Sequence, residues 1–523
     1  MEKRLIIAIG LSVLVMMAFQ KVMPPTQQIQ TETIYNNDMQ PVDSQEVEEK
    51  RNILTIKEEL FEEQTDKLSI IFSNVNGAIK SIKLKEYDFV IFNEEKPSQY
   101  LFNTVDLQPY AKINQSPFSV QQEKGKITFS YHSLESQYII KKEYKFTEDS
   151  YDIGLSIITE NGSDVTGAYK YEVTTSPVIS EVSGVKGQKF IETNFQVNGV
   201  LVTKKNIKKA KEYIKGIIGW TAVKNRYFII AVQPPKTADQ ITIAKTDNNE
   251  MIETVILEPQ IIAPGQSAQN EFMLVVAPLK KEVLGQYNIG LEKAINYGFF
   301  GGISSLLLSL LAFIFKIVHN WGVAIIVVTI IINAALLPLT KKSMSSMYKM
   351  QELQPHMERL RQLHKDNPQK LNKEMMELYK EYNVNPFGGC LPMLLQFPIF
   401  IAFYQALMRS TELKNASFLW IKDLSGPDAL FTFSQKIPIL GQSFNLLPII
   451  TLILMIVQQK VTTAGQKNIS PEMAQQQKMM ALIFPLFFGV ILYNFSSGLV
   501  LYWLTNSVLM TTEQYFIKKK LQK

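Results

Sequence analysis

The chain has 523 residues, of which 46% are hydrophobic and 20% charged, and its formal net charge is +6. This length exceeds that of one ordinary domain, since a domain usually has about 100–200 residues. The basic surplus is too small for a nucleic-acid-binding protein, which would gather positive charge on one face. Cys390 is the only cysteine and the four histidines form no zinc-binding cluster, so we expect no disulfide, no metal site and no other cofactor.

The N-terminal segment predicts a membrane anchor. Lys3 and Arg4 precede an apolar run from residue 5 to residue 19, as in a signal sequence. The residues that follow offer no small-residue cleavage site. We therefore interpret residues 1–22 as an uncleaved signal-anchor span with a cytoplasmic N-terminus, with a cleaved signal peptide as the alternative. Residues 23–50 are polar and rich in Gln, Thr and Glu, which is typical of a flexible tether.

Residues 51–285 alternate between apolar and polar side chains with period two, which predicts a soluble all-β domain. Turn signals such as Asn76-Gly77 and Lys124-Gly125 separate the short strands, and this pattern favours a β-sandwich. We expect strands at residues 68–72, 126–131, 138–146, 241–244 and 251–257. The domain contains no nucleophile elbow, phosphate loop or metal cluster. A scaffolding or docking role is therefore favoured over sugar binding.

Residues 286–523 are predicted to form a membrane core, and the near-zero mean hydropathy of +0.01 averages this half with the polar half. Lys293 and Lys316 lie near the two ends of the first apolar stretch, which favours an interfacial helix over 287–317. Five spans then follow at residues 321–339, 391–408, 444–457, 479–494 and 498–517. With the signal anchor, the predicted fold is a six-span α-helical bundle plus an exported β-sandwich.

The distribution of Lys and Arg orients these spans. Basic residues gather in the segments 341–380, 460–478 and 518–523, and all three fall on one side of the membrane if both termini are cytoplasmic. The β-sandwich then lies on the opposite side. A large exported domain does not follow the charge rule, so its mixed charge is no objection.

The first basic segment predicts a cytoplasmic helical hairpin over residues 341–385. Two apolar stripes follow helical spacing, and Lys365 to Pro368 separates them. The first stripe contains Met344, Met347, Met350, Leu353, Met357, Leu360 and Leu363, and the second contains Leu371, Met375, Leu378, Tyr379 and Tyr382. The stripes either pack on each other or, at the membrane-proximal methionines Met344, Met347 and Met350, offer an adaptable apolar surface to varied clients.

The predicted spans carry no Asp, Glu, Lys, Arg or His at mid-depth. Proton-coupled transporters and ion pumps usually need such groups, and intramembrane proteases need a Ser/His or paired-Asp arrangement. The polar residues that remain are neutral: Thr329, Asn333, Gln396, Gln405, Thr505 and Asn506. They either form hydrogen bonds between helices or line a hydrated cavity.

Several motifs of the second half resemble the YidC family of membrane protein insertases. They are the run from Asn385 to Phe400, Pro338–Thr340, Leu353–Pro355 and Ser497–Tyr502. The resemblance begins near Tyr297 and extends to the end of the chain, and the order and spacing of the motifs agree. The signal anchor and the large exported domain are similar to the Gram-negative branch, whose sandwich resembles mutarotase-like folds in class without being taken as an enzyme.

The resemblance implies a non-enzymatic insertase and chaperone of the bacterial inner membrane with a periplasmic β domain. Its implied partners are nascent membrane proteins, the lipid bilayer, the Sec translocon and, transiently, the ribosome. By family position, Thr329, Asn333, Gln396, Tyr502 and Trp503 would form the substrate groove. The family usually has an arginine where this chain has Asn333. Either the groove works by hydration alone, which we favour, or Lys341 and Lys342 supply charge from its mouth. Some relatives have tyrosine in place of Trp503.

Two other functional classes compete with this interpretation. A polytopic transporter or flippase with an exported sensor domain would need intramembrane charge or an inverted repeat, and we find neither. A carbohydrate-binding module on a membrane anchor would leave the five later spans without a purpose.

Overall fold

The computed structural model describes residues 57–106, 113, 116–133, 137–180, 191–205, 210–245, 251–365, 367–382, 384, 391–437, 441–463, 475, 483 and 485–521. Glu58–Lys523 form one compact unit, and the structure below is that of this unit. The predicted signal anchor 1–22 and tether 23–50 lie outside the described residues, as do Cys390 and the start of the predicted span 479–494, of which residues 483 and 485–494 are described.

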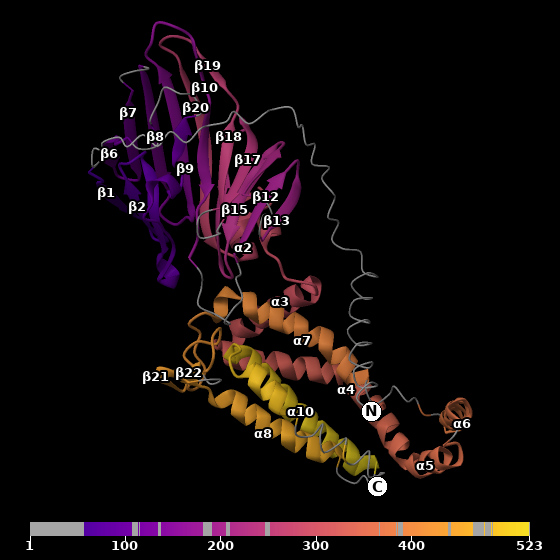
Figure 1. The fold of residues 1–523 in the computed structure, drawn as a ribbon. Coiled ribbons are helices and arrows are strands. Elements are labelled where there is room, and N and C mark those ends of the chain that lie inside the picture. Colours follow the sequence, from indigo (N-terminus) through magenta and orange to yellow (C-terminus); the bar gives the residue numbers. More distant parts are fainter. Residues whose placement is uncertain are drawn as a thin grey trace. The chain divides into compact units, whose positions relative to one another are not determined.

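The first half of this unit is an all-β domain built on two large sheets (Figure 1). The nine-stranded sheet has the order β13 (Val200–Lys204), β12 (Glu192–Val197), β15 (Ile218–Lys224), β16 (Phe228–Gln233), β20 (Ser267–Pro278), β9 (Asp152–Asn161), β8 (Tyr138–Phe146), β7 (Lys126–His132) and β6 (Ser119–Glu123). The five-stranded sheet has the order β14 (Lys211–Lys215), β17 (Ala238–Lys245), β18 (Met251–Leu257), β11 (Tyr171–Ser176) and β5 (Thr104–Asp106). One hydrophobic core contains side chains of both sheets, such as Phe195 and Trp220 from one and Ile243 and Val255 from the other. The predicted all-β domain is confirmed.

Smaller sheets complete the β domain. Four strands form a meander, β1 (Leu60–Gln64), β2 (Leu68–Ser73), β3 (Ala78–Leu84) and β4 (Phe89–Asn93), and β10 (Gly167–Tyr169) pairs with β19 (Gln260–Ile262). The predicted turn at Asn76-Gly77 joins β2 to β3, with φ of 62° and 54°. A Cβ on Gly77 would lie 2.6 Å from the Cβ of Phe129, so this position needs glycine for space as well as for backbone conformation.

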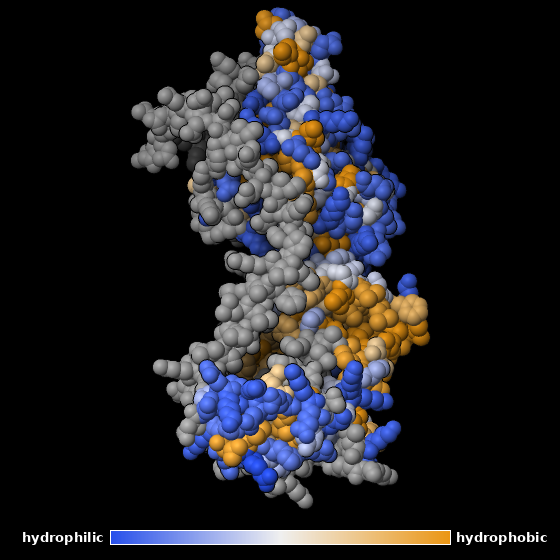
Figure 2. Space-filling model, turned by 90° about the vertical axis from the view of Figure 1, so that its right-hand side faces the viewer, coloured by the Kyte–Doolittle hydropathy of each residue, from blue (hydrophilic) through white to orange (hydrophobic). Residues whose placement is uncertain are grey.

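Helices make up most of the second half. They are α2 (Lys281–Leu284), α3 (Gly301–Val318), α4 (Trp321–Glu352), α5 (Gln354–Leu363), α6 (Pro368–Glu381), α7 (Leu391–Arg409), α8 (Leu446–Thr463) and α10 (Ser497–Leu521), and a hairpin of β21 (Phe431–Ile437) and β22 (Gly441–Phe444) precedes α8. Among the described residues, α3 and α4 are long and apolar enough to cross a membrane, and α8 is a shorter apolar helix. Six spans therefore remain a prediction. Figure 2 shows apolar surface over these helices and hydrophilic surface over the β domain and over α5 and α6.

Two predicted helix boundaries differ from the structure. The helix expected over 287–317 begins at Gly301, because the chain before it turns at Gly290 and Gly298, both with φ near 80°. The stripe expected on one helix of the hairpin is divided at Leu353, since α4 continues to Glu352 and α5 starts at Gln354. Met344, Met347 and Met350 therefore lie on the C-terminal end of α4.

An isolated carboxyl group lies in the core of the β-sandwich. Glu253 on β18 has no exposed surface, and its neighbours in the sheet are Ile243 and Ser176. Neither carboxyl oxygen has a hydrogen-bond partner within normal distance among the described residues. Burial raises the pKa of Glu253 well above its ordinary value, and the nearby Thr221 hydroxyl offsets only part of this rise. The folded state therefore keeps a proton that the unfolded chain loses.

We predict that Glu253 makes the β domain less stable as the pH rises. Above the ordinary glutamate pKa of about 4.5 the folded state binds more protons than the unfolded state. The free energy of unfolding then falls with pH by up to about 1.4 kcal/mol per pH unit. The Glu253→Gln variant has no proton to lose, so its melting temperature should fall less between pH 5 and about pH 8 than that of the parent chain. Glu271→Gln, an exposed control on β20, should keep the parent slope. Equal slopes for Glu253→Gln and the parent would contradict this account.

Candidate functional site

Two polar side chains of α4 lie on one face of this otherwise apolar helix. Residues 321–339 contain no charged residue, and Thr329 and Asn333 are four residues apart. The Thr329 hydroxyl donates a hydrogen bond to the carbonyl of Ile325 (2.6 Å), and the Asn333 amide donates one to the carbonyl of Thr329 (2.8 Å). These bonds within α4 pair the Thr329 hydroxyl and one N–H of the Asn333 amide with backbone carbonyl groups of an apolar helix.

Asn506 on α10 connects α4 to α7. Its side-chain oxygen accepts a hydrogen bond from Asn333 Nδ2 of α4 (3.0 Å) and a longer one from Gln396 Nε2 of α7 (3.3 Å). Gln396 also donates to the hydroxyl of Tyr502 on α10 (2.6 Å). Tyr502 and Asn506 are four residues apart and so share a face of α10. We call Asn333, Gln396, Tyr502 and Asn506 the amide network.

The amide network is enclosed by the three helices. Tyr502 is fully buried, Asn333 and Asn506 are 6% exposed, and Gln396 is partly buried. The ring of Tyr502 stacks on that of Phe403 with centroids 4.4 Å apart, which holds the hydroxyl toward Gln396. An amide left unpaired in hydrocarbon costs several kcal/mol, roughly 4–8 on a cyclohexane scale. Mutual hydrogen bonding therefore stabilises the closed arrangement.

The amide network lies well inside the helices. At about 1.5 Å per residue, Asn333 is roughly 18 Å from the start of α4 at Trp321, and Asn506 is roughly 14 Å from the start of α10 at Ser497. The hydrocarbon core of a bilayer is about 30 Å thick. If these helices cross a bilayer, their polar groups meet near mid-depth.

The structure joins three of the five predicted groove residues, Asn333, Gln396 and Tyr502, through the amide network. Thr329 is buried on the same face of α4 as Asn333, and its hydroxyl bonds within α4. Trp503 follows Tyr502 but points about 100° away around the helix. Its ring instead contacts Phe400 at 4.9 Å and stacks on Phe488 at 5.3 Å, so it belongs to an aromatic group beside the amide network.

The predicted client-contact methionines lie elsewhere. Met344 is 5% exposed, so it offers little surface in this structure, whereas Met347 and Met350 are partly exposed. Met344 is 11 residues beyond Asn333, roughly 16 Å along α4. The methionines and the amide network are therefore separate features of one helix.

Asn506 was not among the five predicted groove residues. Its side-chain oxygen nevertheless accepts the hydrogen bonds from both Asn333 and Gln396. The sequence held a signal for it. Asn506 follows Tyr502 by four residues, which is the same spacing that places Thr329 and Asn333 on one face. A search for such pairs in every predicted span would have included it.

The amide network offers hydrogen bonding rather than covalent chemistry. Its side chains are amides and a phenol, and none is a carboxylate, imidazole or thiol. The part of the chain that the structure describes contains no group of three or more His, Cys, Asp or Glu placed to hold a metal ion. Such an arrangement can exchange hydrogen bonds with water or with a peptide and can open between helices.

Comparison with known proteins identifies the family. Residues 62–310 match the model of the YidC periplasmic domain, and residues 313–523 match that of the 60Kd inner membrane protein. The membrane protein insertase YidC of Geotalea daltonii is 32% identical, with 100% of both chains covered. That of Endomicrobium trichonymphae is 34% identical and covers 89% of this chain and 86% of its own.

A crystal structure of an active YidC insertase with its first transmembrane domain resolved is also similar. It is 20% identical and covers 87% of this chain and 92% of that chain, with a TM-score of 0.39. At this score the likeness supports no conclusion about how the elements are arranged. The full-length sequence similarity is decisive: this chain belongs to the YidC family of membrane protein insertases, which act in the inner membrane and carry a periplasmic domain.

Proposed function

We propose that this insertase receives hydrophobic segments of nascent membrane proteins between α4, α7 and α10, and releases them laterally into the bilayer. The observation that carries the proposal is the amide network, whose hydrogen bonds join these three helices at Asn506. A substrate that separates the helices would expose four polar side chains in place of hydrocarbon.

The physical gain comes from hydration at half depth. A charged or polar segment is expensive to move into hydrocarbon, by about 2.5–3.5 kcal/mol per charged residue on insertion scales. When the helices separate, the exposed side chains of the amide network attract water. This water shortens the distance through hydrocarbon that the polar part of a substrate must cross. Asn333 attracts no anion, since it is neutral where the family usually has arginine. Hydration alone then serves both acidic and basic segments.

We propose the six-span topology with both termini in the cytoplasm and the β domain in the periplasm. The basic residues that support it include Lys341 and Lys342 at the end of the apolar part of α4, and Lys519 and Lys520 after that of α10. In this topology α3 lies at the periplasmic interface. The helix is long enough to span by composition, and Lys316 in its last turn favours the interface instead.

The cytoplasmic hairpin is proposed to meet substrates first. Its helices α5 and α6 contact each other through Met357 and Tyr379, and His364 Nε2 lies 2.7 Å from Glu374 Oε2. These contacts support the view that the stripes pack on each other. Leu363 and Met376 remain more than half exposed and are free for clients, together with part of Met347 and Met350. Partnership with the Sec translocon and with the ribosome remains a prediction from the family resemblance.

The first prediction concerns Asn333. Asn333→Leu removes the amide group that donates a hydrogen bond to Asn506. We therefore expect a severalfold loss of insertion of a substrate with a polar exported segment, measured in proteoliposomes. Asn333→Arg keeps hydrogen-bond donors and should retain insertion. A leucine variant with the parent's activity would remove Asn333 from the mechanism.

The second prediction concerns the strength of the amide network, which must be small if substrates open it. A double-mutant cycle of Asn333→Ala and Asn506→Ala should give a coupling free energy of about 0.6–1.7 kcal/mol in mixed-micelle unfolding. Thr505→Ala is the matched control, because the Thr505 hydroxyl bonds to Leu501 of its own helix (2.8 Å). Its coupling to Asn333 should lie within about 0.3–0.5 kcal/mol of zero. Coupling that small for Asn333 and Asn506 as well would show that they do not interact.

The third prediction separates the two halves of the chain. A chain without residues 51–280 should still support growth of cells depleted of their own insertase, because the amide network is built entirely on later helices. A chain without residues 354–381 should not. The opposite result would favour the β domain as the functional part and the helices as its anchor.

A further inference from the structure

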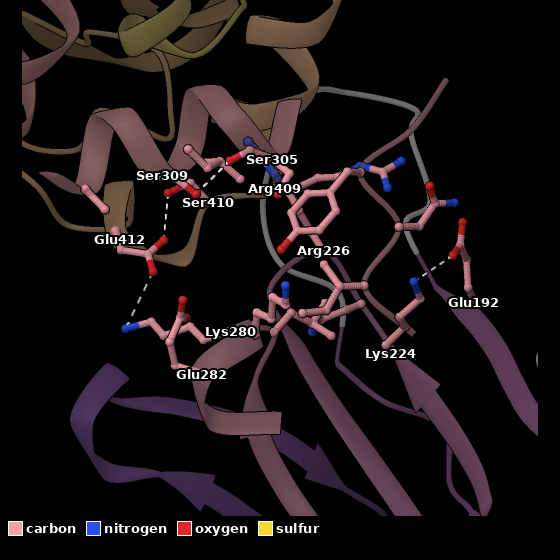
Figure 3. A pocket seen from close by; sticks show the side chains of 18 of the residues that line it. Glu192, Lys224, Arg226, Lys280, Glu282, Ser305, Ser309, Arg409, Ser410 and Glu412 are labelled. Atoms are coloured by element: carbon pink, nitrogen blue, oxygen red, sulfur yellow. Dashed lines mark hydrogen bonds and ion pairs between the residues drawn. The ribbon is translucent and has the colours of Figure 1, made fainter. Parts of the chain in front are cut away.

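A polar cavity of about 250 Å³ lies within the Glu58–Lys523 unit, between strand ends of the β domain and the helices α3 and α7 (Figure 3). Glu192, Lys224 and Arg226 line it from the β domain, and Lys280, Lys281 and Glu282 line it from the start of α2. Ser305 and Ser309 of α3 also line it, as do Arg409 at the end of α7 and Ser410 and Glu412 after it. The amide network does not take part in this cavity.

Positive charge exceeds negative charge around the cavity. The cationic lining residues are Lys224, Arg226, Lys280, Lys281 and Arg409, and the anionic ones are Glu192, Glu282 and Glu412. Several of the cations are already engaged. Lys224 lies 3.0 Å from Glu192 and donates to the carbonyl of Ala294 (2.6 Å), Lys280 lies 3.8 Å from Glu412, and Arg226 binds the carbonyl oxygen and the sulfur of Met408.

Arg409 is different from these cations. It is partly buried at the end of α7, and among the described residues no hydrogen bond or ion pair joins its guanidinium to the protein. A guanidinium carries five N–H donors in a rigid planar fork that matches two oxygens of a phosphate. Among the described residues, therefore, no protein acceptor competes with a ligand in the cavity for these donors, and Glu192 acts on Arg409 only through its charge.

The cavity borders a helix face that needs an apolar environment. Leu306, Phe313 and Ile317 of α3 are 68%, 60% and 62% exposed, and they form one face of the helix. Ser305 and Ser309 lie on the neighbouring face, about 100° or less away around the helix. Trp321, a residue type common at the membrane–water boundary, also lines the cavity. In the topology proposed above, which this inference shares, the cavity therefore lies where the hydrocarbon ends and lipid headgroups begin.

We propose that this cavity binds the headgroup phosphate of a phospholipid of the periplasmic leaflet, with Arg409 as its direct ligand and the acyl chains along the exposed face of α3. Basic cavities beside membrane helices are suited to phospholipid headgroups. An acidic peptide would match the charge but would leave the apolar face of α3 uncovered. This lipid site is independent of the insertase mechanism proposed above, because it shares no residue with the amide network.

Native mass spectrometry of the full chain in a mild detergent tests the proposal, with phosphatidylglycerol, phosphatidylethanolamine or phosphatidylcholine added in turn. We expect one tightly bound phospholipid on the parent chain and about tenfold weaker binding to Arg409→Gln. Arg409→Lys keeps the charge without the planar fork and should fall between them. Ser309→Phe fills the cavity from α3 without changing its charge and should also weaken binding.

The matched control is Lys316→Gln, which removes an exposed charge from the same helix outside the cavity lining and should bind like the parent. Equal melting temperatures of the variants show that they are folded. Millimolar inorganic phosphate should not displace the lipid, because it lacks the acyl chains. Three results would overturn the site: unchanged lipid binding by Arg409→Gln and Ser309→Phe, equal loss in Lys316→Gln, or displacement of the lipid by inorganic phosphate or by an acidic peptide.

Discussion

A single amide oxygen holds the three central helices in register. Asn506 on α10 accepts hydrogen bonds from Asn333 on α4 and Gln396 on α7, and no other residue described here joins polar groups of all three helices. In an apolar medium each amide needs a hydrogen-bond partner, which a facing helix or entering water supplies. These bonds add a polar contact between helices that also share an apolar core, and the rings of Tyr502 and Trp503 pack beside them.

The same bonds are suited to being broken. Interhelical hydrogen bonds in membranes average only about 0.6 kcal/mol, so a hydrophobic substrate can displace them at low cost. A charged network would bind more strongly and would favour substrates of the opposite charge. Asn333 therefore suits a protein that must accept varied segments and then release them. The lipid site beside α3 concerns a different surface, where the β domain meets the interface.

The sequence predicted those features that depend on local periodicity. Strands such as β8 and β18 follow from alternating side chains, because each strand buries one face against a core. Thr329 and Asn333 were found for a similar reason, since four residues bring two side chains to one face of a helix. The family motifs of the second half then predicted membership of the insertase family, and the full-length relatives confirm this prediction.

The features that sequence reasoning missed depend on tertiary packing. One helical step of about 100° separates Tyr502, which lies beside Gln396 and Phe403, from Trp503, which lies beside Phe400 and Phe488. Only the packing of the neighbouring helices decides which of the two joins the amide network. Met344 and Met347 belong to the same apolar stripe. Tertiary packing buries Met344 and leaves Met347 partly exposed. The sequence carries no signal for Arg409, because the cavity that it lines is assembled from segments more than 200 residues apart in the chain, such as Glu192 and Glu412.

The central claim is that substrates pass between α4, α7 and α10. Site-specific photo-crosslinking from position 333 to a stalled nascent membrane protein tests it most directly, with position 331 as a control because Ile331 is 41% exposed on the outer face of α4. We predict a strong adduct from position 333 and a weak one from position 331. No adduct at position 333, or equal adducts at both positions, would contradict the claim.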